Sequence, residues 1–486
     1  MIRTLTPYPA YKDSGVPWLG EVPRHWEVKP LKRWVSINAA VLPDTTAADY
    51  QFRYIDIGTV GTGFLIREPQ QMRFGDAPSR ARRVLRRGDT IVSTVRTYLK
   101  AVYHVDRDVD ALVCSTGFAV LTPGPGTQPR YVSYLAQSSP FTDCISAESV
   151  GTAYPAIAES RLGSFHVPVP TLWEQTAIVR FLDYMDRRIR RYIRAKQKLI
   201  KLLEEYKQAL IHQAVTGRID VRTGQSYPSY KDSGVEWLGQ MPEHWELKPL
   251  KRWVRINASV LPDTTPADYE FRYIDIGTVG TGFLTREPQQ LRFGNAPSRA
   301  RRVLHMGDTI ISTVRTYLKA VYYVDGDAEA LVCSTGFAVL TPGPSTQPKY
   351  VSYLVQSNTF TDRVTAESVG TAYPAIAEGR LGSFYVPIPP LPEQTAIVEY
   401  LDAQTAKIGA AIAAARSEIE LLREYRTRLI ADVVTGKLDV REVAARLPEE
   451  PPEEEAELMD TDETAEGEAT DDDAAAEALS EEEVEP

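Results

Sequence analysis

The chain up to Val440 is one sequence written twice, with a constant offset of 219 residues and no insertion. The segment YKDSGVPWLG at 11–20 returns as YKDSGVEWLG at 230–239, and RYIDIGTVGTGF at 53–64 returns unchanged at 272–283. Solenoid repeats have periods of roughly 20–50 residues, so a period this long describes whole domains. The repeat therefore predicts two domain-sized copies that carry two sites of nearly the same specificity.

The body of the chain is basic although the whole chain is acidic. Overall, 55 Lys and Arg residues stand against 65 Asp and Glu residues, a net charge of −10. Residues 447–486 hold 19 of the acidic residues and no Lys or Arg, which leaves residues 1–446 with about +9. A basic body permits a nucleic-acid partner, although an ordinary solvated surface explains the charge equally well. We expect the acidic tail to be disordered, either as a solubilising extension or as a DNA-mimicking segment that competes for a basic groove.

Several signals exclude other classes of protein. No run of eighteen apolar residues occurs, and MIRTLTPYPA lacks the apolar core of a signal peptide, which predicts a soluble, cytoplasmic protein. The three cysteines have no disulfide or zinc spacing, so no metal site is expected. The chain contains no GxxxxGK[ST] loop, HExxH pair or methyltransferase Asn/Asp-Pro-Pro-aromatic motif. GTVGTGF at 58–64 is spaced GxxGxG and is interpreted as a hairpin turn, so the chain is predicted to be non-catalytic.

Each copy is predicted to be an α/β (α+β) globule followed by a long helix. Short β-branched and aromatic runs such as 52–60 and 111–121 alternate with Gly and Pro turns, and a proline cluster precedes each helix. The predicted order is a first globule at 1–170, a long helix at 171–217, a second globule at 218–389, a second long helix at 390–436 and the acidic tail at 441–486.

The two predicted helices have the pattern of a coiled-coil pair. Apolar residues of the first helix recur every three or four positions, at Ile178, Leu182, Met185, Ile189, Tyr192, Leu199, Leu203, Tyr206 and Leu210. A rod of about 65 Å with one apolar face needs a partner, which the second copy supplies. Residues 180–201 hold nine basic and two acidic residues, whereas 399–420 hold two basic and four acidic ones, so the helices are predicted to have complementary charge. The residues expected between the helices are Ile178, Leu182, Ile189, Ile193, Leu203, Ile397, Leu401, Ile408, Ile412 and Leu422.

Four ordered motifs connect the chain to a known family. They are YKDSGVPWLGEVPRHWEVKPLKRW (11–34), GDTIVSTVRTYL (88–99), ESVGTAYPAI (148–157) and VPVPTLWEQTAIVRFLD (167–183), and each recurs in the second copy. Over almost all of residues 7–440 the chain resembles the specificity subunit of type I restriction–modification enzymes. A stand-alone DNA-binding regulator of the same architecture is the alternative, and a self-sufficient methyltransferase or nuclease lacks its motifs.

The resemblance implies that each globule is a target recognition domain for one half of a bipartite DNA site. It implies that the two helices pack antiparallel and set the gap between the half-sites. Two methyltransferase (modification) subunits would methylate adenine with S-adenosylmethionine, and two restriction subunits would supply ATP- and magnesium-dependent translocation and cleavage. This chain would hold no cofactor itself.

One departure from the family pattern bears on the target. The recognition domains of one chain usually differ strongly and the helices resemble each other, whereas here TTAADYQFRYIDIGTVGTGF (45–64) keeps 18 of 20 residues and 178–203 only 10 of 26. Near-identical readers in a pseudo-two-fold internal repeat should recognise an interrupted palindrome.

Three loops of each copy concentrate side chains that can read or hold DNA. In the first copy they are residues 79–89, 93–100 and 149–157. Other roles stay open: Arg82 and Arg83 as solvated surface, Tyr98 as core, and GTAYPAI as a turn that positions a helix. Arginines 187, 188, 190, 191 and 194 could contact spacer phosphates, the second helix or a methyltransferase subunit. Arg86, Arg87 and Arg107 become His305, Met306 and Gly326, so the copies should hold the DNA backbone with different strength. The predicted DNA-binding residues are Arg80, Arg82, Arg83, Arg96, Thr97, Tyr98, Lys100, Gly151, Thr152 and Tyr154, with Arg299, Arg301, Arg302, Arg315, Thr316, Tyr317, Lys319, Gly370, Thr371 and Tyr373.

Overall fold

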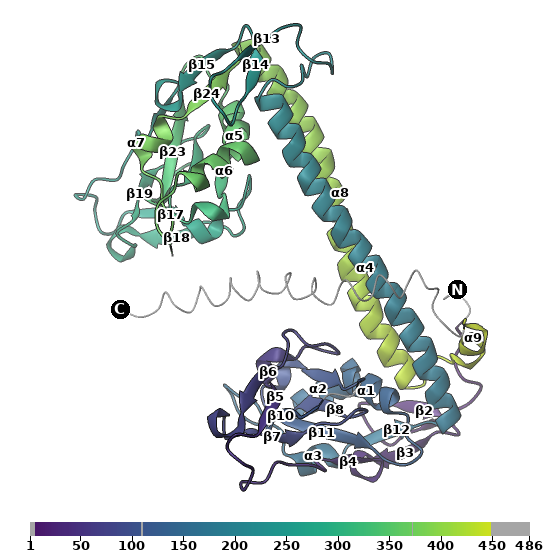
Figure 1. Cartoon of the computed structure of the whole chain (residues 1–486). Helices are drawn as coiled ribbons and strands as arrows, with labels where there is room; N and C mark the ends of the chain where they lie inside the picture. The colour runs from purple at the N-terminus through teal and green to yellow at the C-terminus, as the bar shows by residue number, and fades with distance from the viewer. Residues whose placement is uncertain (1–4, 108–109, 372, 449–486) are drawn as a thin grey trace. The chain divides into compact units, whose positions relative to one another are not determined.

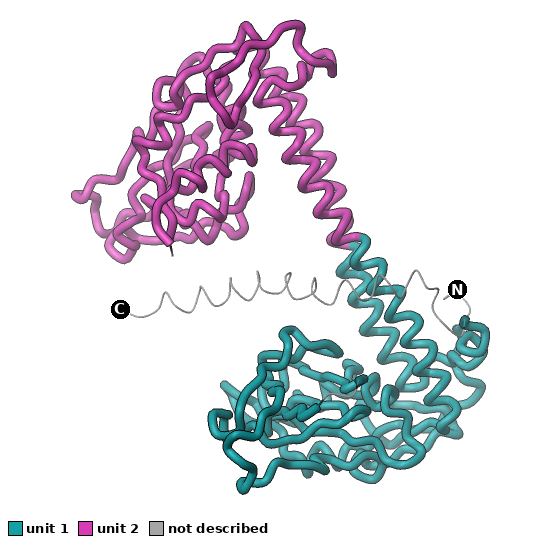
Figure 2. The backbone as a smooth tube through the Cα atoms, viewed as in Figure 1, with its two compact units in different colours: residues 1–195, 418–486 teal, residues 196–417 magenta. Residues whose placement is uncertain are grey.

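The structure is a computed structural model that describes residues 5–107, 110–371 and 373–448 (Figure 1). It divides into two compact units (Figure 2): unit 1 comprises residues 1–195 and 418–486, and unit 2 comprises residues 196–417. Each unit contains one globule together with part of each of two long helices, α4 (Leu172–Val215) and α8 (Leu391–Val434). Within these described residues, no helix combines the length and the apolar character needed to cross a bilayer.

The globule of unit 1 contains two four-stranded sheets. One has the order β6-β5-β10-β7 and includes a parallel pair, β5 with β10, while the other is antiparallel with the order β4-β11-β8-β9. Two short antiparallel pairs, β1-β2 and β3-β12, complete it. The strands are β1 (Tyr11–Asp13), β2 (Glu21–Pro23), β3 (Glu27–Pro30), β4 (Val35–Ile37), β5 (Gln51–Ile55), β6 (Gln70–Arg73), β7 (Ala81–Val84), β8 (Thr90–Ser93), β9 (Val102–His104), β10 (Leu112–Ser115), β11 (Phe118–Pro123) and β12 (His166–Val169). The helices are α1 (Pro129–Gln137), α2 (Ser139–Ala147), α3 (Glu159–Gly163) and the 3₁₀ turn η5 (Thr97–Leu99).

The globule of unit 2 repeats this topology strand for strand. Its four-stranded sheets have the orders β18-β17-β22-β19 and β16-β23-β20-β21. The strands are β13 (Tyr230–Asp232), β14 (Gln240–Pro242), β15 (Glu246–Pro249), β16 (Val254–Ile256), β17 (Glu270–Ile274), β18 (Gln289–Arg292), β19 (Ala300–Val303), β20 (Thr309–Ser312), β21 (Val321–Tyr323), β22 (Leu331–Ser334), β23 (Phe337–Pro342) and β24 (Tyr385–Ile388). The helices are α5 (Pro348–Gln356), α6 (Asn358–Ala366), α7 (Glu378–Gly382) and the turn η9 (Thr316–Leu318).

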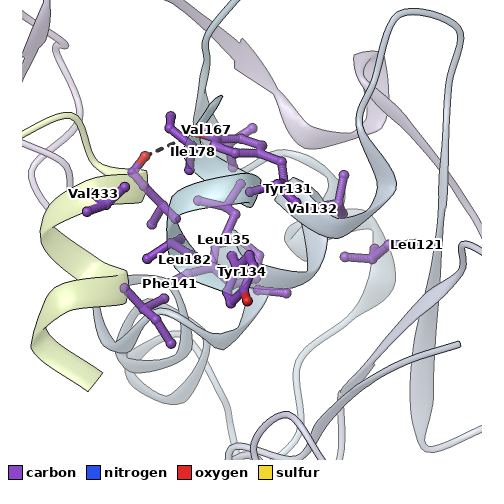
Figure 3. Packing of buried hydrophobic residues seen from close by; sticks show 14 of the residues in the cluster. Leu121, Tyr131, Val132, Tyr134, Leu135, Phe141, Val167, Ile178, Leu182 and Val433 are labelled. Atoms are coloured by element: carbon purple, nitrogen blue, oxygen red, sulfur yellow. Dashed lines mark hydrogen bonds between the residues drawn. The ribbon is translucent and has the colours of Figure 1, made fainter. Parts of the chain in front are cut away.

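The long helices are held in the core of each globule rather than attached to its surface. In unit 1, Ile178 and Leu182 of α4 and Val433 of α8 are buried in the same cluster as Leu135 of α1 (Figure 3). Tyr131 is fully buried and donates from its hydroxyl to the carbonyl oxygen of Val434 at 3.1 Å. Burying such side chains contributes roughly 1.5–3 kcal/mol each, so the helices and the globule form one folding unit.

The long helices pack antiparallel in each unit considered separately. The start of α4 lies against the end of α8 in unit 1, and the start of α8 lies against the end of α4 in unit 2. Six of the ten residues expected between the helices are buried, namely Ile178, Leu182, Ile189, Ile397, Leu401 and Ile408. The other four, Ile193, Leu203, Ile412 and Leu422, are half-buried. The predicted fold class, two α/β globules with an antiparallel helix pair, is thereby confirmed.

One detail of the helix prediction is wrong. Tyr192, Leu199 and Tyr206, which continue the apolar spacing, are 52, 41 and 56 % exposed. The spacing along a 44-residue helix drifts around its axis, so a strict three-or-four count leaves the buried face. Two ion pairs between the helices, Asp186–Arg426 and Glu204–Arg416, place the carboxylate on α4 and the arginine on α8. Antiparallel packing puts 178–195 opposite 418–434, not opposite 399–417.

The short segment that follows each long helix packs against one of the globules. In unit 2, Arg222 binds Asp220 at 2.9 Å and Glu393 at 3.2 Å, and Gly217 packs on Pro242 with φ of +73°. Residues 435–441 do the same for unit 1. There Arg441 binds Asp439 at 2.6 Å and Glu174 at 3.8 Å, and Gly436 packs on Pro23 with φ of +79°. The segment DVVTGKLDV at 432–440, which is the counterpart of QAVTGRIDV at 213–221, therefore completes the globule at the beginning of the chain.

The beginning of the predicted disordered tail is ordered. Residues 441–446 form helix α9 (Arg441–Arg446), and Ala444 and Leu447 are buried in the core of unit 1. These apolar residues distinguish 441–447 from the acidic sequence that follows. The rest of the predicted tail, residues 449–486, lies outside the described residues.

Candidate nucleic-acid interface

The structure brings two of the three predicted loops together in each unit. The loop 94–100 and the loop 149–157 are joined by a bridge between Val95 and Ala156 and by a 2.9 Å hydrogen bond from the Ile157 amide to the Thr94 carbonyl. In unit 2, Val314 and Ala375 form the same bridge, and the Ile376 amide donates to Thr313 at 2.9 Å. We call the joined loops the recognition loops.

The predicted threonine is structural. Thr97 is 2 % exposed, and its hydroxyl donates to the Ser149 hydroxyl at 2.8 Å, while Ser146 donates to the Thr97 carbonyl. Thr316 makes the equivalent 2.8 Å contact with Ser368. Thr97 and Thr316 therefore connect the two loops of each unit through hydrogen bonds made beneath the exposed surface.

The residues on either side of that threonine turn have an unusual backbone. Arg96 and Lys100 flank η5, and both adopt the left-handed conformation, with φ of 51° and 48°. Arg315 and Lys319 repeat it around η9, with φ of 52° and 48°. This conformation costs an L-residue roughly 1–2 kcal/mol, and such strain gathers at functional sites. Two strained non-glycine residues retained in both copies indicate a loop shaped for contact.

The side chains above this backbone form an exposed Arg–Tyr stack. The Arg96 guanidinium lies over the Tyr154 ring at 4.7 Å, and Arg315 lies over Tyr373 at 4.8 Å. Tyr154 is 60 % exposed and Tyr98 is 56 % exposed. Stacking fixes the plane of the guanidinium, whose forked donors can bind guanine O6 and N7. Arg96 and its tyrosine partner are both exposed to solvent at this position, whereas Arg315 is half-buried.

Other predicted residues of these loops lie around the stack. Lys100 and Lys319 are ion-paired with Asp143 at 2.6 Å and Asp362 at 2.7 Å. Gly151 and Gly370 have φ of 117° and 119°, which allows the second loop to turn. Thr152 and Thr371 are exposed, and so is Tyr317.

The third predicted loop, with its arginines at 80–83, has internal partners. Arg83 is 8 % exposed and ion-paired with Glu159, and Arg302 is 9 % exposed and ion-paired with Glu378. Arg82 binds Asp44 at 3.3 Å and lies over Phe74, while Arg301 binds Asp263 at 3.6 Å and lies over Phe293. Arg80 donates to the Tyr54 hydroxyl at 3.3 Å, and Arg299 interacts with the equivalent Tyr273. Arg83 and Arg302 are therefore buried arginines, each paired with a partly exposed glutamate, which is neither solvated surface nor free to reach DNA.

Sequence reasoning missed the apolar part of the surface. Val150 and Val369 are each 81 % exposed, and Leu99 and Leu318 are exposed beside the tyrosines. The GTVGTGF segment is a hairpin turn, as predicted, with Val60 bridged to Leu65. It adjoins the recognition loops, because Thr62 donates to the Lys100 carbonyl at 2.9 Å. In the described part of the chain, no group of three or more His, Cys, Asp or Glu residues could hold a metal ion.

These features define a protein with the same exposed recognition surface built twice on an α/β globule and helix-pair scaffold. Residues 25–202 and 273–421 match the family described as "Type I restriction modification DNA specificity domain". The chain belongs to this family and contains two of its domains. The predicted class is thereby confirmed: a DNA-binding specificity subunit of a type I restriction system, and not one of its catalytic subunits.

Individual relatives are specificity subunits of type I restriction enzymes by name. The chain is 23 % identical over 303 residues to the type I restriction enzyme MjaVIII specificity subunit of Methanocaldococcus jannaschii, covering 61 % of this chain and 68 % of the relative. It is 22 % identical over 442 residues to the putative MjaX specificity subunit of the same organism, covering 87 % and 96 %. A solved structure entitled "Structural basis underlying complex assembly and conformational transition of the type I R-M system" aligns with a TM-score of 0.65 at 23 % identity, covering 86 % of this chain and 99 % of that chain, which shows a shared fold.

Proposed function

We propose that this chain selects the DNA target of a type I restriction–modification complex, with one recognition domain for each half of a bipartite site. The observation that carries the proposal is the Arg–Tyr stack, which occurs with the same partners and the same strained backbone in both units. Arg96 and Arg315 would read base edges, and Tyr98, Tyr154 and their equivalents would contact bases or phosphates.

The target should be an interrupted palindrome. Residues of the recognition loops are identical in the two copies from Ser93 to Lys100 and from Glu148 to Glu159. The antiparallel helix packing seen in each unit is the arrangement expected to present two such readers to opposite strands. Two equal readers would then select a few bases, a spacer and the inverted complement.

The chain would also be the scaffold for its partner subunits. Leu199, Leu202 and Tyr206 lie at three- and four-residue spacing on α4 and are 41, 52 and 56 % exposed. Exposed apolar stripes of this kind mark interaction surfaces. We assign this stripe to docking of methyltransferase subunits, two per chain, which would bind S-adenosylmethionine. Two restriction subunits would bring ATP- and magnesium-dependent activities, and the complex would act in the cytoplasm.

The experiment is sequencing of methyladenine in DNA from cells that express this chain with a methyltransferase subunit encoded beside it. Methylation at an interrupted palindrome is expected. Arg96→Ala and Arg315→Ala should each weaken recognition of one half-site by roughly 1–3 kcal/mol, about 5- to 150-fold, while Lys12→Ala on β1 should leave it unchanged. Methylation at clearly different half-sites would refute the palindrome, and a stable complex that binds DNA without methylating it would favour a stand-alone regulator.

A further inference from the structure

Unit 1 contains an arginine-lined cleft that the recognition of bases does not explain. It has a volume of about 1450 Å³ and lies between the globule and the parts of α4 and α8 that belong to unit 1. Nine arginines and four carboxylates line it, a formal charge of about +5. His104, also in its wall, adds no charge at neutral pH, because burial lowers its pKa to about 4.

The sequence of the second copy shows that this charge is specific to unit 1. Five of the lining arginines, Arg87, Arg107, Arg187, Arg190 and Arg194, correspond to Met306, Gly326, Ala406, Gly409 and Ala413. The equivalent positions of unit 2 hold four basic and three acidic residues. The recognition loops are unchanged between the copies, so a second role accounts better for the difference than base reading does.

The acidic end of the chain departs from this same unit. Leu447 is buried in the core of unit 1, and Arg180 of α4 donates to its carbonyl oxygen. Asp183 and Arg187, which line the cleft, follow Arg180 at three- and seven-residue spacing on the same side of α4. The segment that continues from Pro448, residues 449–486, contains 19 Asp and Glu residues and no basic residue.

We propose that the acidic segment 449–486 binds the arginine-lined cleft of unit 1. This segment follows directly from residues of unit 1, and such tethering raises its effective concentration towards about the millimolar range. Many weak carboxylate–guanidinium contacts therefore suffice, and the binding should weaken as salt increases. The cleft includes Gly63 and Phe64 of the hairpin that adjoins the recognition loops, so a bound acidic segment would oppose the approach of DNA phosphates to unit 1.

The direct test uses the full chain with the 19 acidic residues of 449–486 replaced by Asn and Gln, and a fluorescent peptide of residues 449–486 added in trans. The peptide should bind at low salt and dissociate as salt rises. The cleft variant carries Arg87→Met, Arg107→Gly, Arg187→Ala and Arg194→Ala, the residues that the second copy has at these positions. It leaves Arg190 in place, because this side chain binds the buried Asp186. We expect its peptide affinity to fall about tenfold or more.

A matched control removes the same charge elsewhere in unit 1. Lys12, Arg24, Arg33 and Arg73 are exposed and do not line the cleft, so their joint replacement by Ala should change peptide affinity far less. An equal loss in both variants, or no loss in the cleft variant, would overturn the proposal, provided that melting curves show both to be folded. Binding of a short DNA duplex but not of the peptide at the cleft would overturn it as well. Because this readout needs no DNA recognition, its failure is distinct from failure of the proposed function.

Discussion

The buried ion triad between α4 and α8 in unit 1 gives the sharpest stability prediction. Asp186 is 8 % exposed, binds Arg190 at 2.9 Å and also forms an ion pair with Arg426. Burial raises the pKa of Asp186, but Arg190 and Arg426 outweigh this effect, so the pKa lies below its ordinary value. Asp186→Asn would remove the buried carboxylate that both Arg190 and Arg426 bind in the helix interface.

The size of the effect follows from burial. Removing one partner of a buried ion pair costs about 3–5 kcal/mol. The side chains of Arg190 and Arg426 are 29 and 20 % exposed, and this partial screening favours the lower end, about 3 kcal/mol. For a unit of this size, that loss corresponds to a decrease in Tm of roughly 6–12 °C. The decrease should appear in the transition of unit 1.

Thermal scans would measure the decrease in Tm of Asp186→Asn. Hydrogen exchange of the segments 178–195 and 420–434 would assign the loss to unit 1, with the segment 397–407 of unit 2 as the unaffected reference. Asp186→Thr with Arg190→Ala and Arg426→Leu is the control, because it removes all three charges together; the second copy also lacks a charge at the first two positions, with Thr405 and Gly409. Replacing the whole triad should cost much less than Asp186→Asn, because no charge is left uncompensated. The argument from burial would be refuted if Asp186→Asn lowered the free energy of unfolding by less than about 0.5 kcal/mol, or if the control were destabilised equally.

Two other outcomes are expected. Burial lowers the pKa of His104 to about 4, against about 6.5 in an unfolded chain, so the unfolded state gains a proton first as the pH falls. The free energy of unfolding of unit 1 should therefore fall by roughly 3 kcal/mol between pH 6.5 and 4. His104→Tyr, which introduces the residue of the second copy, should remove this part of the pH dependence in urea unfolding. An unchanged slope of unfolding free energy against pH would contradict the prediction. In the recognition loops, Gly151→Ala should leave the chain folded but weaken binding to one half-site, because φ is +117° and the new Cβ would lie 3.3 Å from the Tyr154 carbonyl oxygen. Gly370→Ala should affect the other half-site equally in a DNA-binding titration, and an effect of Gly151→Ala on the melting temperature alone would argue against a role in recognition.

Much of the architecture follows from local sequence. The exact repeat predicts two similar globules, and the buried runs around Ile178, Leu182, Ile397 and Leu401 predict paired helices, because apolar spacing is a local property. The missing catalytic motifs and the four ordered family motifs can be recognised without coordinates. The sequence also predicts the two loops at 93–100 and 149–157 as a DNA-binding surface, since Arg, Thr, Tyr and Gly cluster there.

Only the tertiary structure decided which charged residues are available and which lie together. Arg82 and Arg83 are neighbours in a basic run, yet strand pairing buries Arg83, which forms an ion pair with the partly exposed Glu159. The stack of Arg96 on Tyr154 joins residues 58 positions apart, and its left-handed backbone leaves no mark in residue type. The cleft is lined by both Arg87 of the globule and Arg194 of α4, which are far apart in the sequence. The repeat and the apolar periodicity are properties of the sequence itself. Ion pairing, backbone strain and clefts depend on contacts between distant segments, which form only when the chain folds.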